Sequence, residues 1–463
     1  MVVSLLLLAC GGPTPPPGES PPPADSGPAD TGEAPPTWTP LPPTALLTRA
    51  SVDLRGVLPT AAELDAAEAD TGAVDPMIAA WLQDPRLGAQ VEELYADLLY
   101  TRADRFPTSA ADLGLDDEAG FAQSVGDQPL RMVRRVVDED LPWTELVTAD
   151  WTMADETLAA VWPLTRAEGG AGWEVASWTD GRPAAGVLSS NSLYWRHPST
   201  DSNANRGRAN VLSRVFLCND YLAHPIPFDE EISLVDEEAV RDALAHDPGC
   251  VSCHVSLDPL AAYFFGFQYH FDEDPWERVR YHPGRADEWA DSLPVGPGYF
   301  GVPGGDLRTL GASVAADPRF VSCTVETFTS TLDGRALGLG DTNSLVTHRE
   351  AFLRGGAHLR PLLASILASP AYRAAPSDDA AAVSGTPRLL TPMQLASVIE
   401  DLTGFRMSQE GWDLLRSDLH GFRLMAGGGG RGRGQRPRGA ALADLVARPG
   451  APRRAGCGGG GGA

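Results

Sequence analysis

The sequence lacks the short motifs that mark the commonest enzyme classes. It has no G-x-S-x-G nucleophile elbow, no phosphate-binding P-loop and no H-E-x-x-H zinc-protease signature. No run of about 18 consecutive apolar residues is present, which is the length that a helix needs to span a bilayer. Alternating apolar and polar residues, the pattern of half-buried strands, are few. Local motifs therefore favour none of these hydrolase and nucleotide-binding classes, and the pattern indicates few strands.

Positive charge is also scarce. The chain has 36 Lys and Arg against 62 Asp and Glu, a formal net charge of -26. Such a surface repels a phosphate backbone, so we expect no nucleic-acid partner. It could steer a basic redox partner towards the protein, although solubility alone also explains acidity. The exception is the low-complexity tail, 427–463, where seven Arg against one Asp give +6. This tail differs so much from the rest that we expect a shifted reading frame there.

The start of the chain has the order of an anchored, exported protein. The apolar run 5–8 leads into Ala9, Cys10 and Gly11, and this L-L-A-C resembles the lipobox of bacterial lipoproteins. We expect lipidation at Cys10 and an extracytoplasmic protein held at the outer membrane or the periplasmic face in a Gram-negative bacterium. A signal peptide normally has a Lys or Arg before its apolar run, and none is present here. The alternative is therefore a short hydrophobic N-terminus that is not cleaved. The Pro/Gly-rich segment 11–43 predicts an extended tether.

Helical spacing dominates the remainder. Apolar residues at 91, 94, 95, 98 and 99 lie on one helix face, and those at 359, 362, 363, 366 and 367 repeat the spacing. Thr60 and Thr391 are expected N-caps. Further helices are predicted at 129–139, 206–220, 236–246, 318–332 and 391–403. Two Gly/Pro-rich stretches, 165–186 and 283–305, are expected to be long loops. The fold class is mainly α: irregular multi-helix domains with long Gly/Pro-rich loops.

The strongest chemical signal is C-x-x-C-H at 250–254, the attachment pattern of c-type haem. Two thiols one helical turn apart form thioethers with the haem vinyl groups, and the next imidazole reaches the iron. We therefore expect one covalent haem on Cys250 and Cys253, with His254 as the proximal iron ligand. A redox C-x-x-C would need a βαβ context, and a zinc site would need a second pair of ligands. No other C-x-x-C, C-x-x-H or H-x-x-H occurs.

The remaining cysteines suggest one disulfide. Cys10 is assigned to the lipid, and Cys457 lies in the doubtful tail. Cys218 and Cys323 are left, each on an apolar helical stripe. Unpaired buried cysteines are common as small apolar residues, but in an oxidising compartment a pair is usually bridged. We expect a Cys218–Cys323 disulfide that clamps the segments on either side of the haem motif.

Neighbouring residues extend the pattern. R-G at 206–207 opens the helix that carries Cys218, D-P at 258–259 follows the haem motif, and Cys323 leads into G-R at 334–335. This combination resembles the cytochrome-associated proteins of uncharacterised domain type that planctomycetes and myxobacteria contain. The resemblance implies a secreted c-type cytochrome module without an established substrate.

The resemblance also suggests the domain organisation. The chain departs from the family pattern after 258–259, where Leu260 and Ala261 stand in place of an expected glycine. The expected segments are a lipoprotein signal at 1–10, the tether at 11–43, an N-terminal helical cytochrome-associated domain at 44–165, the haem-bearing c-type cytochrome-like module at 186–375, the start of a further, truncated helical domain at 389–426, and the basic tail at 427–463.

The ligand opposite His254 decides what a haem here can do. No Met occurs between Met153 and Met393, so histidines are the main alternatives, and His270 is the first to test. The other candidates are His246, His282, His348 and His358.

We expect electron transfer with an unknown redox partner. A haem enzyme with an open distal side, peroxidase-like, is one alternative. A surface polysaccharide-binding lipoprotein is another, suggested by Trp at 143, 151, 162, 173, 178 and 195. Whether the protein is an enzyme stays open, with an electron carrier favoured.

Overall fold

The structure is a computed structural model that describes residues 38–103, 105–167, 170–200, 202–223, 236–376, 390–409, 412–415 and 422–426. The expected lipid site Cys10, the signal 1–10, most of the tether and the tail 427–463 lie outside these residues. None of the helices in the described part combines the length and apolar character needed to cross a membrane.

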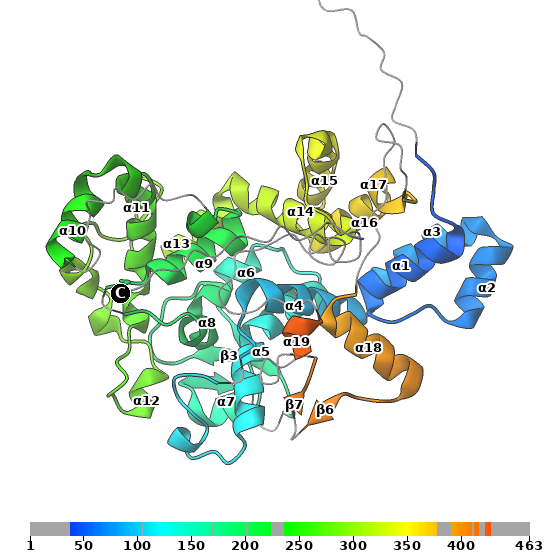
Figure 1. Cartoon of the computed structure of the whole chain (residues 1–463). Coiled ribbons are helices and arrows are strands. Elements are labelled where there is room, and N and C mark those ends of the chain that lie inside the picture. Colours follow the sequence, from blue (N-terminus) through cyan, green and yellow to red (C-terminus); the bar gives the residue numbers. More distant parts are fainter. Residues whose placement is uncertain are drawn as a thin grey trace, which may run out of the picture.

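The described chain is mainly helical, which confirms the expected fold class at that level (Figure 1). The first helices are α1 Pro43–Arg55, α2 Ala61–Ala69, α3 Val74–Trp81, α4 Arg86–Leu99, α5 Glu118–Asp138, α6 Glu145–Thr148, α7 Glu156–Val161, α8 Asn191–Arg196 and α9 Arg206–Leu217. They are followed by α10 Glu237–His246, α11 Pro248–Ala261, α12 Pro275–Arg278, α13 Leu307–Ala316, α14 Pro318–Asp333, α15 Thr342–Arg354, α16 Leu359–Leu367, α17 Pro370–Arg373, α18 Pro392–Thr403 and α19 Phe422–Met425.

The helix starts follow the sequence closely. Thr60 and Thr391 each accept a hydrogen bond from the backbone three residues on, and Glu63 and Gln394 complete two capping boxes. The apolar stripes predicted for α4 and α16 face the core: Leu99 and Ile366, for example, are fully buried. One start was wrong: the helix expected from 129 begins eleven residues earlier, as α5. Pro129 lies inside it, at a position where proline removes one backbone hydrogen bond of the helix.

A small sheet corrects the loop expected at 165–186. Its strands are β1 Thr152–Ala154, β2 Leu164–Arg166 and β3 Glu174–Trp178, in the order β1-β3-β2 with both pairs antiparallel. The strands are short, so their alternation was too brief to show as a period-two pattern. Two further hairpins pair β4 Gly298–Tyr299 with β5 Val302–Pro303, and β6 Ser408–Gln409 with β7 Trp412–Asp413. The segment 283–305 is otherwise irregular, with two single turns of 3-10 helix.

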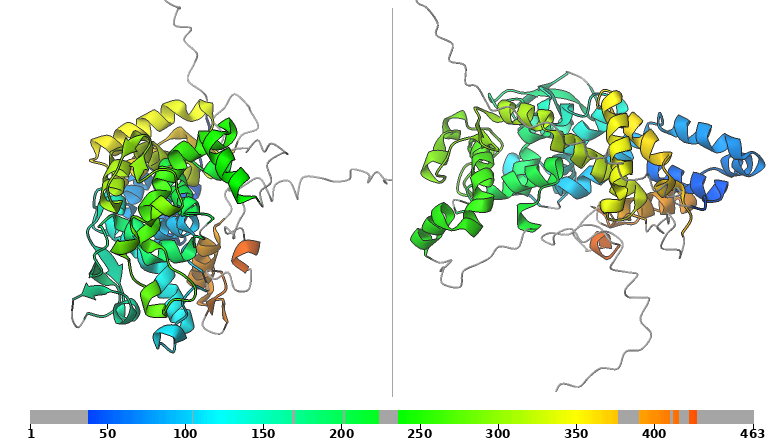
Figure 2. Two further views of the ribbon diagram at one scale, coloured as in Figure 1. Left: turned by 90° about the vertical axis from the view of Figure 1, so that its left-hand side faces the viewer. Right: turned by 90° about the horizontal axis from the view of Figure 1, so that it is seen from above.

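The main hydrophobic core draws on both halves of the chain. It runs from Leu46 in α1 to Tyr372 in α17, so the expected domains 44–165 and 186–375 contribute to one core. A second cluster lies around β1–β3, α5 and α8 and is built on Phe121, Trp162 and Trp195. The views of Figures 1 and 2 agree that the molecule is elongated, with α10 and α11 at one end and α1–α3 at the other.

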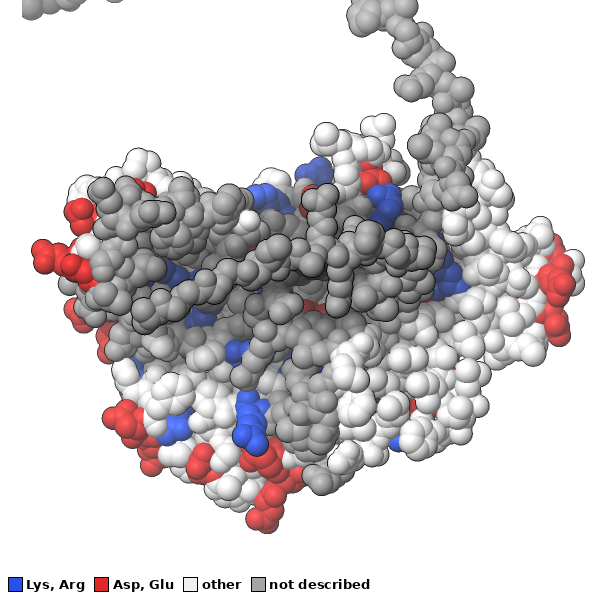
Figure 3. Space-filling view, in the orientation of Figure 1, with Lys and Arg blue, Asp and Glu red and all other residues white. Residues whose placement is uncertain are grey.

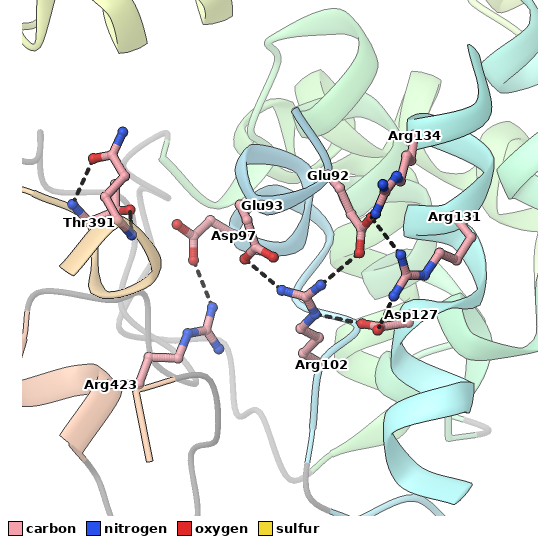
Figure 4. Close-up of polar contacts among 10 residues, drawn as sticks. Glu92, Glu93, Asp97, Arg102, Asp127, Arg131, Arg134, Thr391 and Arg423 are labelled. Atoms are coloured by element: carbon pink, nitrogen blue, oxygen red, sulfur yellow. Dashed lines mark hydrogen bonds and ion pairs between the residues drawn. The ribbon is translucent and has the colours of Figure 1, made fainter. Parts of the chain in front are cut away.

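A partly buried ion network joins α4 to α5 (Figure 4). Arg102 binds Glu92, Glu93 and Asp127 at 2.9, 2.6 and 2.6 Å, and Arg131 also reaches Glu92 and Asp127. Because each buried carboxylate has a guanidinium partner, the network satisfies charges that burial alone would disfavour. Elsewhere the visible face carries acidic side chains at its α10 end, at its α2 end and along its lower edge, in keeping with the net negative charge (Figure 3).

Candidate haem-attachment site

The C-x-x-C-H motif occupies the first two turns of α11. Asp247 caps this helix: its Oδ1 accepts hydrogen bonds from the backbone N–H groups of Gly249 and Cys250, at 2.8 and 3.1 Å. Pro248 stands at the first helical position, where a missing N–H costs nothing. The sequence D-P therefore starts the helix just before the motif and fixes its register.

Helical spacing brings the motif's side chains to one side. Cys250, Cys253 and His254 stand at i, i+3 and i+4, which are neighbours on a helix surface. In the described part of the chain neither cysteine forms a disulfide, and both are partly exposed. Cys253 also packs against the edge of the main core. Two accessible thiols one turn apart, followed by an imidazole, form the donor set that covalent haem attachment needs.

The imidazole is held by a buried carboxylate one turn further along α11. Nδ1 of His254 lies 2.8 Å from Oδ1 of Asp258. Arg206, at the start of α9, donates to both oxygens of that carboxylate, from Nε to Oδ1 at 2.7 Å and from Nη2 to Oδ2 at 3.1 Å. Burial acts to raise the pKa of Asp258, but the hydrogen bonds from His254 and Arg206 outweigh it and hold that pKa below its usual value.

The predicted disulfide fixes the helix that supplies Arg206. The sulfurs of Cys218 and Cys323 lie 2.09 Å apart, which confirms the predicted pairing. Cys218 ends α9 and Cys323 lies buried in α14, so the bond joins these two helices. Beyond α9, the Tyr221 hydroxyl lies 2.8 Å from Oγ of Ser256 on α11. Helix α9 is thus tied on one side to α14 and on the other to the helix that carries the motif.

The charges and burial around Cys250 do not favour its thiolate form. Burial raises the pKa of the Cys250 thiol, and the nearby negative charge of Asp247 raises it further. Reactive C-x-x-C sites instead lower this pKa to stabilise a thiolate. Among the described residues, no group of three or more His, Cys, Asp and Glu side chains is arranged to hold a metal ion. A haem needs only one or two iron ligands from the protein, so it does not require such a group.

His270 lines a hollow whose lining does not include the motif. His270 is exposed beyond the end of α11 and lines a polar hollow with Gln268, Glu288 and Asp291. The lining of that hollow includes neither motif cysteine and not His254. Its role as distal ligand stays a prediction.

Three of the other candidate histidines have a partner within hydrogen-bond distance, whereas His358 has only a longer contact. His246 Nδ1 lies 2.9 Å from a carboxylate oxygen of Asp242, and His282 Nε2 lies 3.0 Å from the Glu277 carbonyl. His348 is buried and lies 2.8 Å from the Ser365 hydroxyl. His358 is 3.7 Å from a carboxylate oxygen of Asp140.

The six tryptophans that suggested a sugar site are buried or half-buried. Trp143, Trp162 and Trp195 are buried, and Trp162 stacks on Trp178 with ring centroids 5.7 Å apart. The Arg182 guanidinium lies 3.5 Å from the centroid of Trp178. The half-buried rings at 151 and 173 pack against the main core. Packing of this kind is the usual role of tryptophan in a folded interior, and the polysaccharide-binding alternative stays a prediction.

In the sequence, Arg206 and Asp258 stand out only as parts of the R-G and D-P pairs, and no role follows from that. The i+4 spacing from His254 was a usable signal for the carboxylate. Nothing local could have indicated Arg206, which is 52 residues away in the chain.

Comparison of the chain with protein-family models, curated proteins and solved structures finds no match.

Proposed function

We propose that the chain is an extracytoplasmic c-type cytochrome, anchored by a lipid at Cys10, that carries one covalent haem and transfers electrons to or from an unknown redox protein. The observation that carries the proposal is the donor set of α11: two unpaired cysteines and an oriented imidazole on one helix face. Cys250 and Cys253 would hold the haem by thioethers, and His254 would be the proximal ligand.

Each residue of the site has a task that follows from its position. The α11 backbone sets the spacing of the two thiols, and Asp247 fixes where that helix begins. Asp258 occupies Nδ1 of His254 and so leaves Nε2 for the iron. When bound, a haem supplies a one-electron couple at the surface of α11.

Two independent predictions support an extracytoplasmic compartment. Lipoprotein maturation at Cys10 and covalent haem attachment both take place outside the bacterial cytoplasm. The Cys218–Cys323 pair agrees with this, because disulfides persist in oxidising compartments. These features support an export route that delivers the chain to the place where haem is attached.

The test is expression with a secretion signal in a host that matures c-type cytochromes, followed by haem staining on a denaturing gel. Wild type is expected to retain haem after denaturation, and the variant with Cys250→Ser and Cys253→Ser is expected to lose it. Ser252→Ala is the matched control, because it changes an exposed side chain between the two cysteines and leaves both thiols and the imidazole in place. A folded, haem-free wild type beside a matured control cytochrome would overturn the proposal.

The native spectrum then separates electron carrier from haem enzyme. A six-coordinate ferric spectrum that cyanide does not change favours the electron carrier, because both axial positions are filled. Rapid cyanide binding favours an open distal side and a peroxidase-like activity. Substitution of His270 by Ala tests whether that residue fills the sixth position: a six-coordinate wild type that becomes five-coordinate assigns it.

A further inference from the structure

We propose that Asp258, held in place by Arg206, is a positioning residue that makes His254 a more basic iron ligand and lowers the reduction potential of the bound haem. This inference rests on the proposed function, because it concerns the ligand of that same haem. It assigns a role to a carboxylate and a guanidinium that neither form a thioether with the haem nor bind its iron.

The geometry fixes which nitrogen of the imidazole is free. An ionised carboxylate only accepts hydrogen bonds, so the proton between the two residues lies on Nδ1 of His254. The neutral ring then has its lone pair on Nε2, the nitrogen that must face the iron. The bond also fixes the plane of the ring, because Asp258 stands one helical turn along the same helix. Histidine ligands commonly depend on such a partner for their tautomer and orientation.

Burial strengthens the effect of the carboxylate. The Asp258 side chain is only 3% exposed, whereas His254 is 22% exposed. In such surroundings water screens the hydrogen bond poorly, so the carboxylate draws the Nδ1 proton strongly. The ring gains partial negative charge and stabilises ferric iron more than ferrous iron. A lower reduction potential follows.

Arg206 limits this effect. Its guanidinium shares Oδ1 with the imidazole and also binds Oδ2, so it neutralises part of the charge that would otherwise act on the ring. Removing the carboxylate and removing the guanidinium must therefore shift the potential in opposite directions. A general loss of structure around the haem would not produce opposite shifts.

The experiment is spectroelectrochemical titration of the purified, haem-loaded wild type and variants at pH 8. Loss of such a partner typically lowers metal affinity about 10–100-fold. If ferric iron bears a loss of about tenfold, Asp258→Asn weakens the preference of the site for ferric over ferrous iron by about tenfold. This corresponds to a rise of about 59 mV for a one-electron couple. Arg206→Gln is expected to shift the potential downward.

The matched control is Asp247→Asn. It removes one negative charge at the start of the same helix without touching His254, and Asn caps a helix about as well as Asp. Its shift is expected to be smaller than that of Asp258→Asn. Equal shifts in these two variants, or shifts of the same sign in Asp258→Asn and Arg206→Gln, would overturn the inference. A wild type without covalent haem would instead overturn the proposed function, and gel staining reports that outcome separately.

Discussion

The Cys218–Cys323 disulfide is expected to supply a large share of the stability of this fold. The two residues are 105 positions apart. Closing a loop of about 100 residues restricts the unfolded chain enough to contribute about 4.7 kcal/mol at 25 °C. Typical domains unfold with about 5–15 kcal/mol, so the loss would be about a third of the total or more. The closed loop also contains the whole C-x-x-C-H motif.

The assay is equilibrium unfolding in urea, followed by tryptophan fluorescence, with and without a reductant. The variant with Cys218→Ala and Cys323→Ala is expected to unfold at a much lower urea concentration than oxidised wild type. Alanine avoids placing a serine hydroxyl at Cys323, which is only 2% exposed.

Reduced wild type provides the control, because it has the native side chains but an open loop. Its transition is expected to move to the same range as that of the double variant, while the reductant should leave the variant unchanged. If the free energy of unfolding of the double variant lies within about 1 kcal/mol of oxidised wild type, the loop-closure reasoning is refuted.

Two further predictions concern stability. Burial lowers the pKa of His197 from 6.5 to about 4, although its hydrogen bond to the Leu99 carbonyl acts to raise that pKa. The stability that the neutral His197 ring contributes to the folded state is therefore present above pH 6.5 and is lost as the pH falls towards 4. Wild type should lose up to about 3 kcal/mol more than His197→Gln between pH 7 and 4 in urea titrations; parallel losses would contradict this. Gly311→Ala should cost about 1–3 kcal/mol by thermal unfolding, because its Cβ would overlap the Val147 carbonyl oxygen, whereas Gly340→Ala meets open space; equal melting temperatures would refute this.

The sequence predicted the features that depend on local spacing. The apolar stripes of α4 and α16 can be recognised in the sequence because every third or fourth residue of such a helix must face the core. The caps at Thr60 and Thr391 can be recognised in the sequence because their capping partners stand three residues further along the chain. The cysteine pair could be predicted by elimination, since the other cysteines already had assignments.

Features that depend on long-range packing could not be predicted. Strands β1–β3 are three to five residues long, too short for a recognisable alternation, and their order depends on segments that meet only in the fold. The pairing of Arg206 with Asp258 likewise requires α9 to lie against α11, and no local pattern encodes that contact. The motif gave the attachment residues, whereas their support became visible only in three dimensions.

The central claim is tested most directly by mass spectrometry of the proteolytic peptide that contains residues 250–254, taken from protein matured outside the cytoplasm. The proposed function predicts that this peptide carries the mass of one haem and that alkylation adds nothing at Cys250 or Cys253. An unmodified peptide with two alkylated thiols, from cells that mature a control cytochrome, would contradict it.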